Sequence, residues 1–344
     1  MVFVNISNML NYKNLNRTII KIFKKRGLSS SHAKISSDAM INAELVGAHS
    51  HGISRLKMYC DRIDKNLINP KPKIKLKKIS KSILSIDADN SIGFVSGIFG
   101  ILEGIKSAKK NGISLVSIKN SNHFGLTGYY LEKAIKHNLI ALGFTNAPPA
   151  IAPYGAKRSL FGTNPIAFGF PSSKKKPFIF DSSMSKINRG KIRFAAKLGK
   201  KIPYGVALDK NGNITTNAKK ALEGVQLPMG DFRGSGLAWV VDILSGVMTG
   251  SAHSGKVKDP FDDFSGPQNI GHLFIVFKAN LFNKRFKNEI NKNIKTVKRL
   301  PKLKGVTEIK YPGQKKYERY QNNLNKNIYL SKKVEKELEV LLRE

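Results

Sequence analysis

Residues 82–118, SILSIDADNSIGFVSGIFGILEGIKSAKKNGISLVSI, decide the predicted fold. They predict a strand over 82–87, a helix over 94–110 that ends at Gly112, and a second strand over 114–118. A strand, a helix and a second strand in this order form the building unit of α/β proteins. The stretch therefore predicts an α/β core.

The same alternation continues toward the C-terminus. The further expected strands cover 139–145, 166–170, 178–180 and 272–277, and the further expected helices cover 129–137, 237–248 and 331–342. The sum is an α/β protein with a central mixed sheet. No strand is followed by G-x-G-x-x-G, and no G-x-x-x-x-G-K-[ST] loop is present. A Rossmann or P-loop nucleotide site is therefore excluded, and a dinucleotide would need another scaffold.

Three helices are expected before the first strand. The first ends at Gly27, the second begins near Ser29, and the third begins after Gly52 with a clear amphipathic stripe. Pro70 and Pro72 close this lobe. We therefore expect a helical N-terminal lobe over 1–75, packing with 310–344, and an α/β core over 76–309.

The charge is unusual, because 60 Lys and Arg stand against 23 Asp and Glu, a net charge of +37. Such a field attracts anionic substrates, nucleic acid or anionic membranes. The basic clusters at 71–81 and 284–304 lack regularly interleaved aromatic residues, and no zinc-ligand spacing is present. The charge is therefore interpreted as a surface property, and nucleic acid is not the expected partner.

Cysteine content and apolar runs bear on the compartment. Cys60 is the only cysteine, which excludes an intrachain disulfide and a cysteine-ligated metal site, and no metal is expected. No run reaches the ~20 apolar residues of a membrane helix. The apolar N-terminal stretch is interrupted by Asn5, Asn8 and Asn11, unlike a signal peptide. We expect a cytoplasmic protein.

The first candidate cluster is Ser50-His51-Gly52-Ile53-Ser54-Arg55, with Tyr59 four residues later. If the third helix extends back to His51, then His51, Arg55 and Tyr59 share one polar face. An arginine fork can hold a carboxylate, and a histidine can exchange a proton with a carbonyl. The cluster suits a substrate with a carboxylate beside a carbonyl. The alternative interpretation is an exposed, solvated helix face.

Other polar clusters follow predicted strands, where α/β proteins place ligands. Residues 120–125 carry His123, a second candidate acid or base. Residues 145–149 and 162–165 carry amides and hydroxyls that can bind a carboxamide or a ribose, and residues 181–183 offer a carboxylate and two hydroxyls. Residues 230–234 open a helix where Arg233 could receive a phosphate. The alternative for all of them is ordinary turn chemistry.

Taken together, these segments resemble the malate/L-lactate dehydrogenase family that is unrelated to the Rossmann-fold enzymes of the same names. Its relatives include ureidoglycolate, sulfolactate and diketogulonate oxidoreductases and piperideine/pyrroline-2-carboxylate reductases. The resemblance runs in order from Leu15 to Leu342. It rests on SHGISR (50–55), NSNHFG (120–125), TNAPP (145–149), FGTNPIAF (161–168), NRGKI (188–192), ALDKNGNITT (207–216) and YPG (311–313).

The resemblance implies a non-Rossmann α/β fold that holds NAD or NADP in an extended conformation, with the active site at a homodimer interface. It implies that His51 or His123 is the proton donor and acceptor and that Arg55 holds a small anionic substrate. The further expected substrate-binding residues are Ser50, Tyr59, Thr163 and Asn164. The expected cofactor-binding residues are Asn146, Asp181, Ser182, Ser183, Arg233, Pro312 and Gly313.

Two departures from the family pattern concern the cofactor. Relatives commonly show Gly-Gly-His/Tyr-Lys-Gly where this chain has Gly230-Asp231-Phe232-Arg233-Gly234, and Gln314 replaces the usual Glu after Pro-Gly. Arg233 keeps a cation, whereas Asp231 would repel a 2′-phosphate, which favours NAD over NADP.

The expected activity is hydride transfer between a nicotinamide and a small 2-oxo or 2-hydroxy acid, malate- or lactate-like. One alternative is a cyclic-imine (piperideine/pyrroline-2-carboxylate) reductase, because the same site serves C=O or C=N. An alternative of another class is a basic nucleic-acid-binding protein on an inactive enzyme scaffold.

Overall fold

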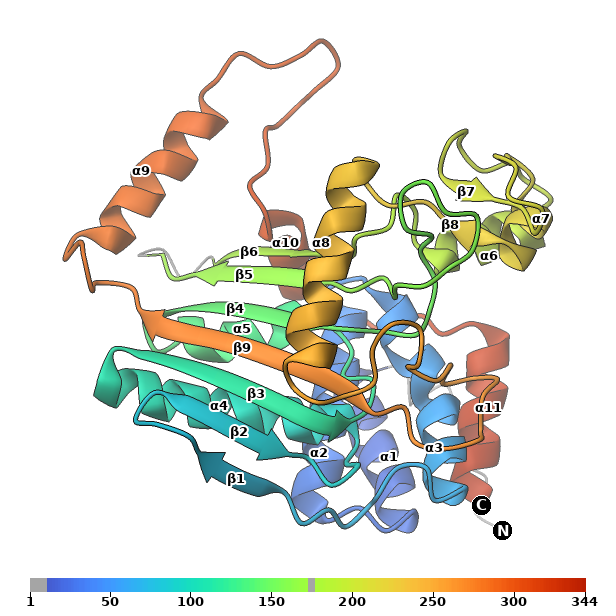
Figure 1. Cartoon of the computed structure of the whole chain (residues 1–344), viewed down its shortest axis with the longest axis horizontal. Helices are drawn as coiled ribbons and strands as arrows, with labels where there is room; N and C mark the ends of the chain where they lie inside the picture. Colours follow the sequence, from blue (N-terminus) through green and yellow to red (C-terminus); the bar gives the residue numbers. More distant parts are fainter. Residues whose placement is uncertain (1–10, 173–176) are drawn as a thin grey trace.

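A seven-stranded mixed sheet lies at the centre of the molecule (Figure 1), in a computed structural model that describes residues 11–172 and 177–344. The strand order is β1-β2-β3-β9-β4-β5-β6; β2 and β3 are parallel, and all other neighbours in this sheet are antiparallel. The strands are β1 (Lys75–Lys78), β2 (Ile83–Asp87), β3 (Ile113–Ser121), β4 (Leu139–Thr145), β5 (Ile166–Phe170), β6 (Phe178–Ser182) and β9 (Ile270–Lys278). The predicted α/β fold with a mixed sheet is confirmed.

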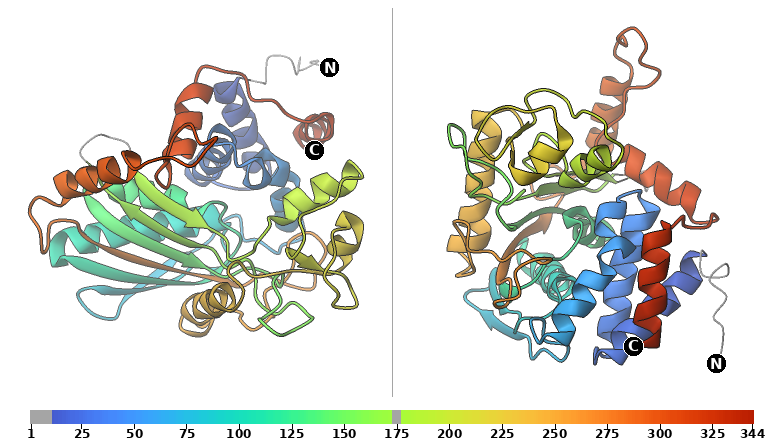
Figure 2. Two further views of the ribbon diagram at one scale, coloured as in Figure 1. Left: turned by 90° about the horizontal axis from the view of Figure 1, so that it is seen from above. Right: turned by 90° about the vertical axis from the view of Figure 1, so that its right-hand side faces the viewer.

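Helices cover both faces of this sheet, with α4 and α5 on one side and α8 on the other (Figure 2). The α-helices are α1 (Tyr12–Lys25), α2 (Ser30–Leu45), α3 (Leu56–Asp64), α4 (Gly93–Asn111), α5 (Thr127–Ile135), α6 (Arg189–Lys197), α7 (Ala218–Glu223), α8 (Phe232–Asp242), α9 (Phe286–Lys298), α10 (Gln314–Asn323) and α11 (Lys332–Arg343). A π-helical segment, Ile243–Val247, continues α8. Among the described residues, no helix combines the length and apolar content that a bilayer span requires.

The period-two alternation of the strands divides the core between these faces. In β9, Leu273 packs in the cluster under α8, whereas Phe274 and Val276 belong to the cluster under α4 and α5. Two glycines let α4 approach the sheet closely: a Cβ at Gly104 would lie 3.0 Å from Val116, and a Cβ at Gly100 would overlap Ile118. The stretch that predicted the fold therefore forms β2, α4 and β3.

Helices from the two ends of the chain pack together. α11 contacts α1 and α3, and α10 contacts α2. Arg26 joins these helices, since its Nε lies 3.0 Å from an Asp64 oxygen and its Nη2 lies 2.7 Å from a Glu344 oxygen. The division into residues 1–75 with 310–344 and 76–309 stays a prediction. The N-terminal residues used for the signal-peptide argument, Asn11 excepted, lie outside the described residues.

A small unit of α6, α7 and the two-stranded sheet β7 (Ala207–Leu208) and β8 (Val225–Gln226) projects beside the central sheet (Figure 1). It has an apolar cluster of its own, which includes Ile187, Ile192 and Ile202. The sequence predicted none of its helices. Its position matters because α6 lies against the candidate site.

Candidate functional site

The Ser-His-Gly segment forms a turn before α3. Two 3₁₀ turns, His49–His51 and Ile53–Arg55, precede Leu56, so α3 does not extend back to His51, which was the condition for a shared helix face. The physical cause is the buried carboxylate of Glu44, whose Oε1 accepts a hydrogen bond from the Ile53 N–H at 2.8 Å. A Cβ at Gly52 would overlap this carboxylate. His51 and Arg55 are therefore presented by a turn that Glu44 shapes.

Tyr59 is fully buried, which argues against the alternative of an exposed, solvated helix face. Its hydroxyl lies 2.6 Å from Nδ1 of His123, a residue of the loop that follows β3. The backbone N–H of His123 donates to Gln268 Oε1 at 3.2 Å. Burial raises the pKa of Tyr59, so the phenol stays neutral. His123 is thus held by its ring and by its backbone.

The two predicted histidines come together. Their ring centroids are 5.8 Å apart with nearly parallel planes. Burial, followed by the charges of Arg55 and Lys316, lowers the pKa of His51 to about 4, against the opposing effect of Asp181. Burial, followed by the charge of Arg55, also holds the pKa of His123 well below its ordinary value. Both imidazoles are therefore neutral near pH 7, a state that can accept a proton.

Arg55 stands at the edge of this pair. Its Nε donates to the Ser50 carbonyl oxygen at 2.8 Å, and its guanidinium lies 4.9 Å from the ring centroid of Phe261. Ser50 Oγ lies 3.0 Å from His51 Nδ1. Within the described parts of the chain, no carboxylate lies within 4.0 Å of Arg55. A half-buried guanidinium without a carboxylate partner, beside two histidines, is suited to an anionic substrate.

A second group of predicted residues meets at β6. This strand runs to Ser182, so Asp181 and Ser182 lie within it and do not follow it as expected. Asp181 Oδ2 accepts from the Gly128 N–H at 3.2 Å and pairs with Lys316 Nζ at 3.1 Å. Because Asp181 and Lys316 also act on the pKa of His51, this group adjoins the histidines.

The Tyr-Pro-Gly segment runs beside the same strand. The Pro312 carbonyl accepts from the Ile179 N–H at 3.2 Å. Gly313 has φ +89°, and a Cβ there would lie 3.0 Å from the backbone of Ile179, so this position requires glycine. The segment thereby joins α10 to β6.

A cavity of about 600 Å³ opens between α2, α5, β6 and α10. Asp181, Gly313, Lys316 and Glu132 are among its lining residues. Its volume lies in the range of small-molecule and cofactor sites. A carboxylate that can accept from ribose hydroxyls and an ammonium that can meet a phosphate fit a dinucleotide. No three His, Cys, Asp or Glu side chains of the described residues gather as metal ligands.

Other predicted residues have structural partners. The Asn146 amide donates to the Ala252 carbonyl at 2.6 Å, and the Asn164 amide donates to the Ala238 carbonyl at 2.8 Å. Thr163 accepts from the Met184 N–H through its carbonyl. Both asparagine side chains therefore bind backbone carbonyls and stabilise the loops in which they lie.

The remaining predicted residues lie on the loop after β6 and at the start of α8. Ser182 Oγ donates to the Ser183 carbonyl at 3.1 Å, and Arg233 is exposed in the first turn of α8. Asp231 pairs with Lys186 at 2.6 Å. Lys186 is thus an ion-pair partner of Asp231, and the preference for NAD over NADP stays a prediction.

His272 is a buried histidine that sequence reasoning did not single out. Its Nε2 lies 2.8 Å from Ser121 Oγ and its Nδ1 2.7 Å from Thr145 Oγ1, while its ring stacks on Phe124 at 4.0 Å. Burial lowers its pKa to about 3. It therefore joins β3, β9 and β4 as a neutral group.

Acidification should reveal this burial. The unfolded chain protonates His272 below about pH 6.5, whereas the folded chain does so only near its lowered pKa, so stability is lost as pH falls through 6.5. By pH 5 we expect this residue to remove about 2 kcal/mol from the free energy of unfolding. Urea unfolding at pH 7.5 and 5 measures the loss, and His272→Gln should show a smaller one. An equal loss in both proteins would contradict this assignment.

Comparison with known proteins gives the family that this chain resembles over most of its length. Residues 10–339 match the family model described as malate/L-lactate dehydrogenase. An L-sulfolactate dehydrogenase of Methanocaldococcus jannaschii is 39% identical over 312 residues, 89% of this chain and 88% of that protein. A malate/(S)-sulfolactate dehydrogenase of Methanothermus fervidus is 37% identical over 282 residues, 81% and 83% of the two chains. The solved sulfolactate dehydrogenase of M. jannaschii superposes with a TM-score of 0.92 at 35% identity, covering 97% and 96%.

Relatives whose names include a cofactor divide between the two nicotinamides. A (2R)-3-sulfolactate dehydrogenase (NADP(+)) of Chromohalobacter salexigens is 33% identical over 278 residues, 81% and 83% of the two chains. A ureidoglycolate dehydrogenase (NAD(+)) of Escherichia coli K12 is 31% identical over 292 residues, 84% and 82% of the two chains.

Proposed function

This chain belongs to the malate/L-lactate dehydrogenase family and is an NAD(P)-dependent oxidoreductase, and from that premise we propose that it interconverts a small 2-oxo acid and its 2-hydroxy acid. The observation that carries the proposal is the convergence of His123, fixed by Tyr59, and Arg55, which has no carboxylate partner within the described residues. One group moves a proton and the other holds a carboxylate, as this reaction requires.

Arg55 binds and orients the substrate. Its Nε is held by the Ser50 carbonyl, so its outer nitrogens can receive the substrate carboxylate in a bidentate pair. The carbonyl carbon next to that carboxylate then has a fixed position beside the two histidines. The nicotinamide, when bound, supplies the hydride in reduction and accepts it in oxidation.

His123 moves the proton at Nε2. When Nδ1 carries a proton and donates it to the neutral Tyr59 oxygen, Nε2 has a free lone pair that can accept the hydroxyl proton during oxidation. In reduction the protonated ring returns that proton to the developing alkoxide. The bound substrate carboxylate compensates the Arg55 charge, which otherwise lowers the pKa of His123. His51, 5.8 Å away, is the competing candidate for this role.

The cofactor occupies the cavity beside β6 in this proposal. Asp181 and Lys316 face it, and the Pro312-Gly313 segment closes its edge. NAD and NADP both remain open. A cytoplasmic location also stays a prediction.

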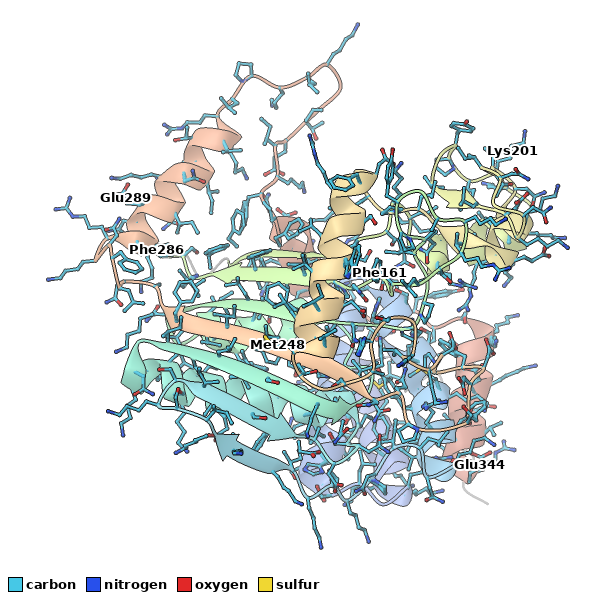
Figure 3. All side chains as sticks on the ribbon, in the orientation of Figure 1. Phe161, Lys201, Met248, Phe286, Glu289 and Glu344 are labelled. Carbon is cyan, nitrogen blue, oxygen red and sulfur yellow. The ribbon has the colours of Figure 1, made fainter. Side chains whose placement is uncertain are left out.

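A homodimer is part of the proposal and is supported by the outer face of α8. Apolar side chains on this face are exposed, with Phe232 at 70% and Trp239 at 58%. Figure 3 shows Phe161 beside α8 and Met248 at its far end. An exposed apolar face on a surface helix is typical of a subunit interface. A second copy would bury it.

Trp239→Glu should therefore yield monomers. A charge placed in the centre of an apolar interface costs several kcal/mol, enough to dissociate most dimers. Sedimentation velocity measures the change, and Phe282→Glu is the control because Phe282 is also exposed but lies outside α8. A Trp239→Glu protein that sediments like the wild type would exclude this face as the interface.

The activity is tested by NADH and NADPH oxidation at 340 nm with oxaloacetate, sulfopyruvate, pyruvate and piperideine-2-carboxylate. Turnover with a 2-oxo acid is the expected result. Turnover with the cyclic imine alone would favour the imine reductase. No turnover and no cofactor binding, together with DNA retention at physiological salt, would favour the nucleic-acid-binding alternative.

A further inference from the structure

Arg62 is a fully buried arginine outside the groups that the proposed reaction uses. It lies in α3 three residues after Tyr59, so the two side chains are neighbours on one face of the helix. Its Nη1 donates to the Asp263 carbonyl at 2.9 Å, and its Nη2 donates to the Gly266 carbonyl at 2.8 Å. Among the described residues, it forms no ion pair with a carboxylate. The free energy of burying this guanidinium is therefore offset by hydrogen bonds to a single loop.

The two carbonyls belong to residues 258–268, the loop that precedes β9. This loop forms its first turn with its own side chain, since Asp259 Oδ1 accepts from the backbone N–H groups of Phe261 and Asp262 at 2.8 and 3.2 Å. A bond of this kind shapes a loop but does not attach it to the rest of the protein. Arg62 provides such an attachment, because it reaches the loop from α3.

The same loop contacts both side chains of the proposed reaction. The ring centroid of Phe261 lies 4.9 Å from the guanidinium of Arg55. Gln268 is buried, and its Oε1 accepts from the His123 N–H at 3.2 Å. The Nε2 of Gln268 donates to the Lys258 carbonyl at 3.1 Å, which ties the two ends of the loop together. The loop therefore packs on the substrate-binding arginine and holds the backbone of the proton-transferring histidine.

We propose that Arg62 is a positioning residue, which attaches loop 258–268 to α3 and thereby keeps the substrate-binding and proton-transferring groups in place. The proposal rests on the proposed function, because that function assigns these roles to Arg55 and His123. Without the guanidinium, two loop carbonyls lose their donors, and the loop loses this attachment. A displacement of about 1 Å at a reacting group can lower a rate about 100-fold. Arg62 thus acts on the reaction through Arg55 and His123 without touching the substrate.

The first test compares steady-state kinetics of oxaloacetate reduction by the wild type, Arg62→Met and Arg26→Met. Arg26 is the matched control, because its side chain is only 6% exposed and pairs with Asp64 and Glu344 rather than with the loop. We expect both variants to unfold at a lower temperature. We expect only Arg62→Met to lose roughly 10- to 100-fold in kcat/KM, through a lower kcat and a higher KM.

The change in KM separates positioning from a loss of folded protein, because partial unfolding lowers the amount of active enzyme and leaves KM unchanged. Arg62→Lys should lie between Arg62→Met and the wild type, since lysine keeps the charge but cannot reach both carbonyls with a planar fork. This variant also serves if Arg62→Met does not fold. Wild-type kcat/KM in Arg62→Met, or an equal loss in Arg26→Met, would overturn the proposal.

Hydrogen exchange, followed by mass spectrometry without any substrate, tests the attachment of the loop itself. In Arg62→Met we expect the amides of residues 258–268 and the amide of His123 to exchange at least about 10-fold faster than in the wild type, because the loop opens more often. Arg26→Met should match the wild type in these peptides. Unchanged exchange in Arg62→Met would overturn the role of Arg62 alone. A wild type inactive on every 2-oxo acid would instead remove the proposed function, and with it the roles of Arg55 and His123.

Discussion

His123→Ala lowers kcat by on the order of 10²- to 10⁴-fold, the contribution expected of a positioned acid and base. The substitution removes the imidazole that Tyr59 holds next to the Arg55 site, and with it the proton acceptor at Nε2. Cofactor affinity should change little, since the cavity is lined by other elements. Stopped-flow measurement of hydride transfer, with cofactor binding followed by fluorescence, separates the two effects.

Two histidine variants control this result. His32→Ala should keep wild-type kcat, because His32 lies in the first turn of α2 and is not among the residues that line the cavity. His51→Ala should reduce kcat less than His123→Ala, since His51 lacks the tyrosine contact and bonds to Ser50 instead. Near-normal kcat in His123→Ala with a large loss in His51→Ala would transfer the role to His51.

Arg55→Leu lowers kcat/KM by on the order of 10²- to 10³-fold, mainly through a higher KM. The reason is the loss of a bidentate, charge-assisted pair in a half-buried site, where each such hydrogen bond contributes roughly 1.5–3 kcal/mol. The kcat/KM of Arg55→Lys should lie between those of Arg55→Leu and the wild type, because lysine keeps the charge but cannot form the bidentate pair of a guanidinium. Initial rates over a range of substrate concentration measure both constants. An unchanged KM in Arg55→Leu would contradict the assignment.

The fold could be predicted where local pattern and tertiary environment agree. In residues 82–118, alternating buried residues and a glycine-ended helix produced β2, α4 and β3. α9 was not predicted, since this Lys- and Asn-rich helix buries no side chain. α10 buries only Gln314, and the short α6 buries only Ile192. Helices that bury little surface leave no apolar periodicity in a sequence.

The site was predictable as a set of residues and not as a geometry. His51, His123 and Arg55 were identified from their motifs. His51 and Arg55 do not lie on one face of α3, however, because the carboxylate of Glu44 stabilises a turn before this helix. The contact of Tyr59 with His123 spans 64 positions of the sequence, so no local pattern could predict it.

Hydride transfer from the nicotinamide to a 2-oxo acid is tested most directly with [4-²H]NAD(P)H, labelled on each face in turn, and oxaloacetate. We expect malate with one deuterium on C2 from one of the two labelled cofactors, and we expect His123→Ala to lose this product. Mass spectrometry of the product reads the label. Unlabelled malate from both cofactors, or no reduced product from any 2-oxo acid, would contradict hydride transfer at this site.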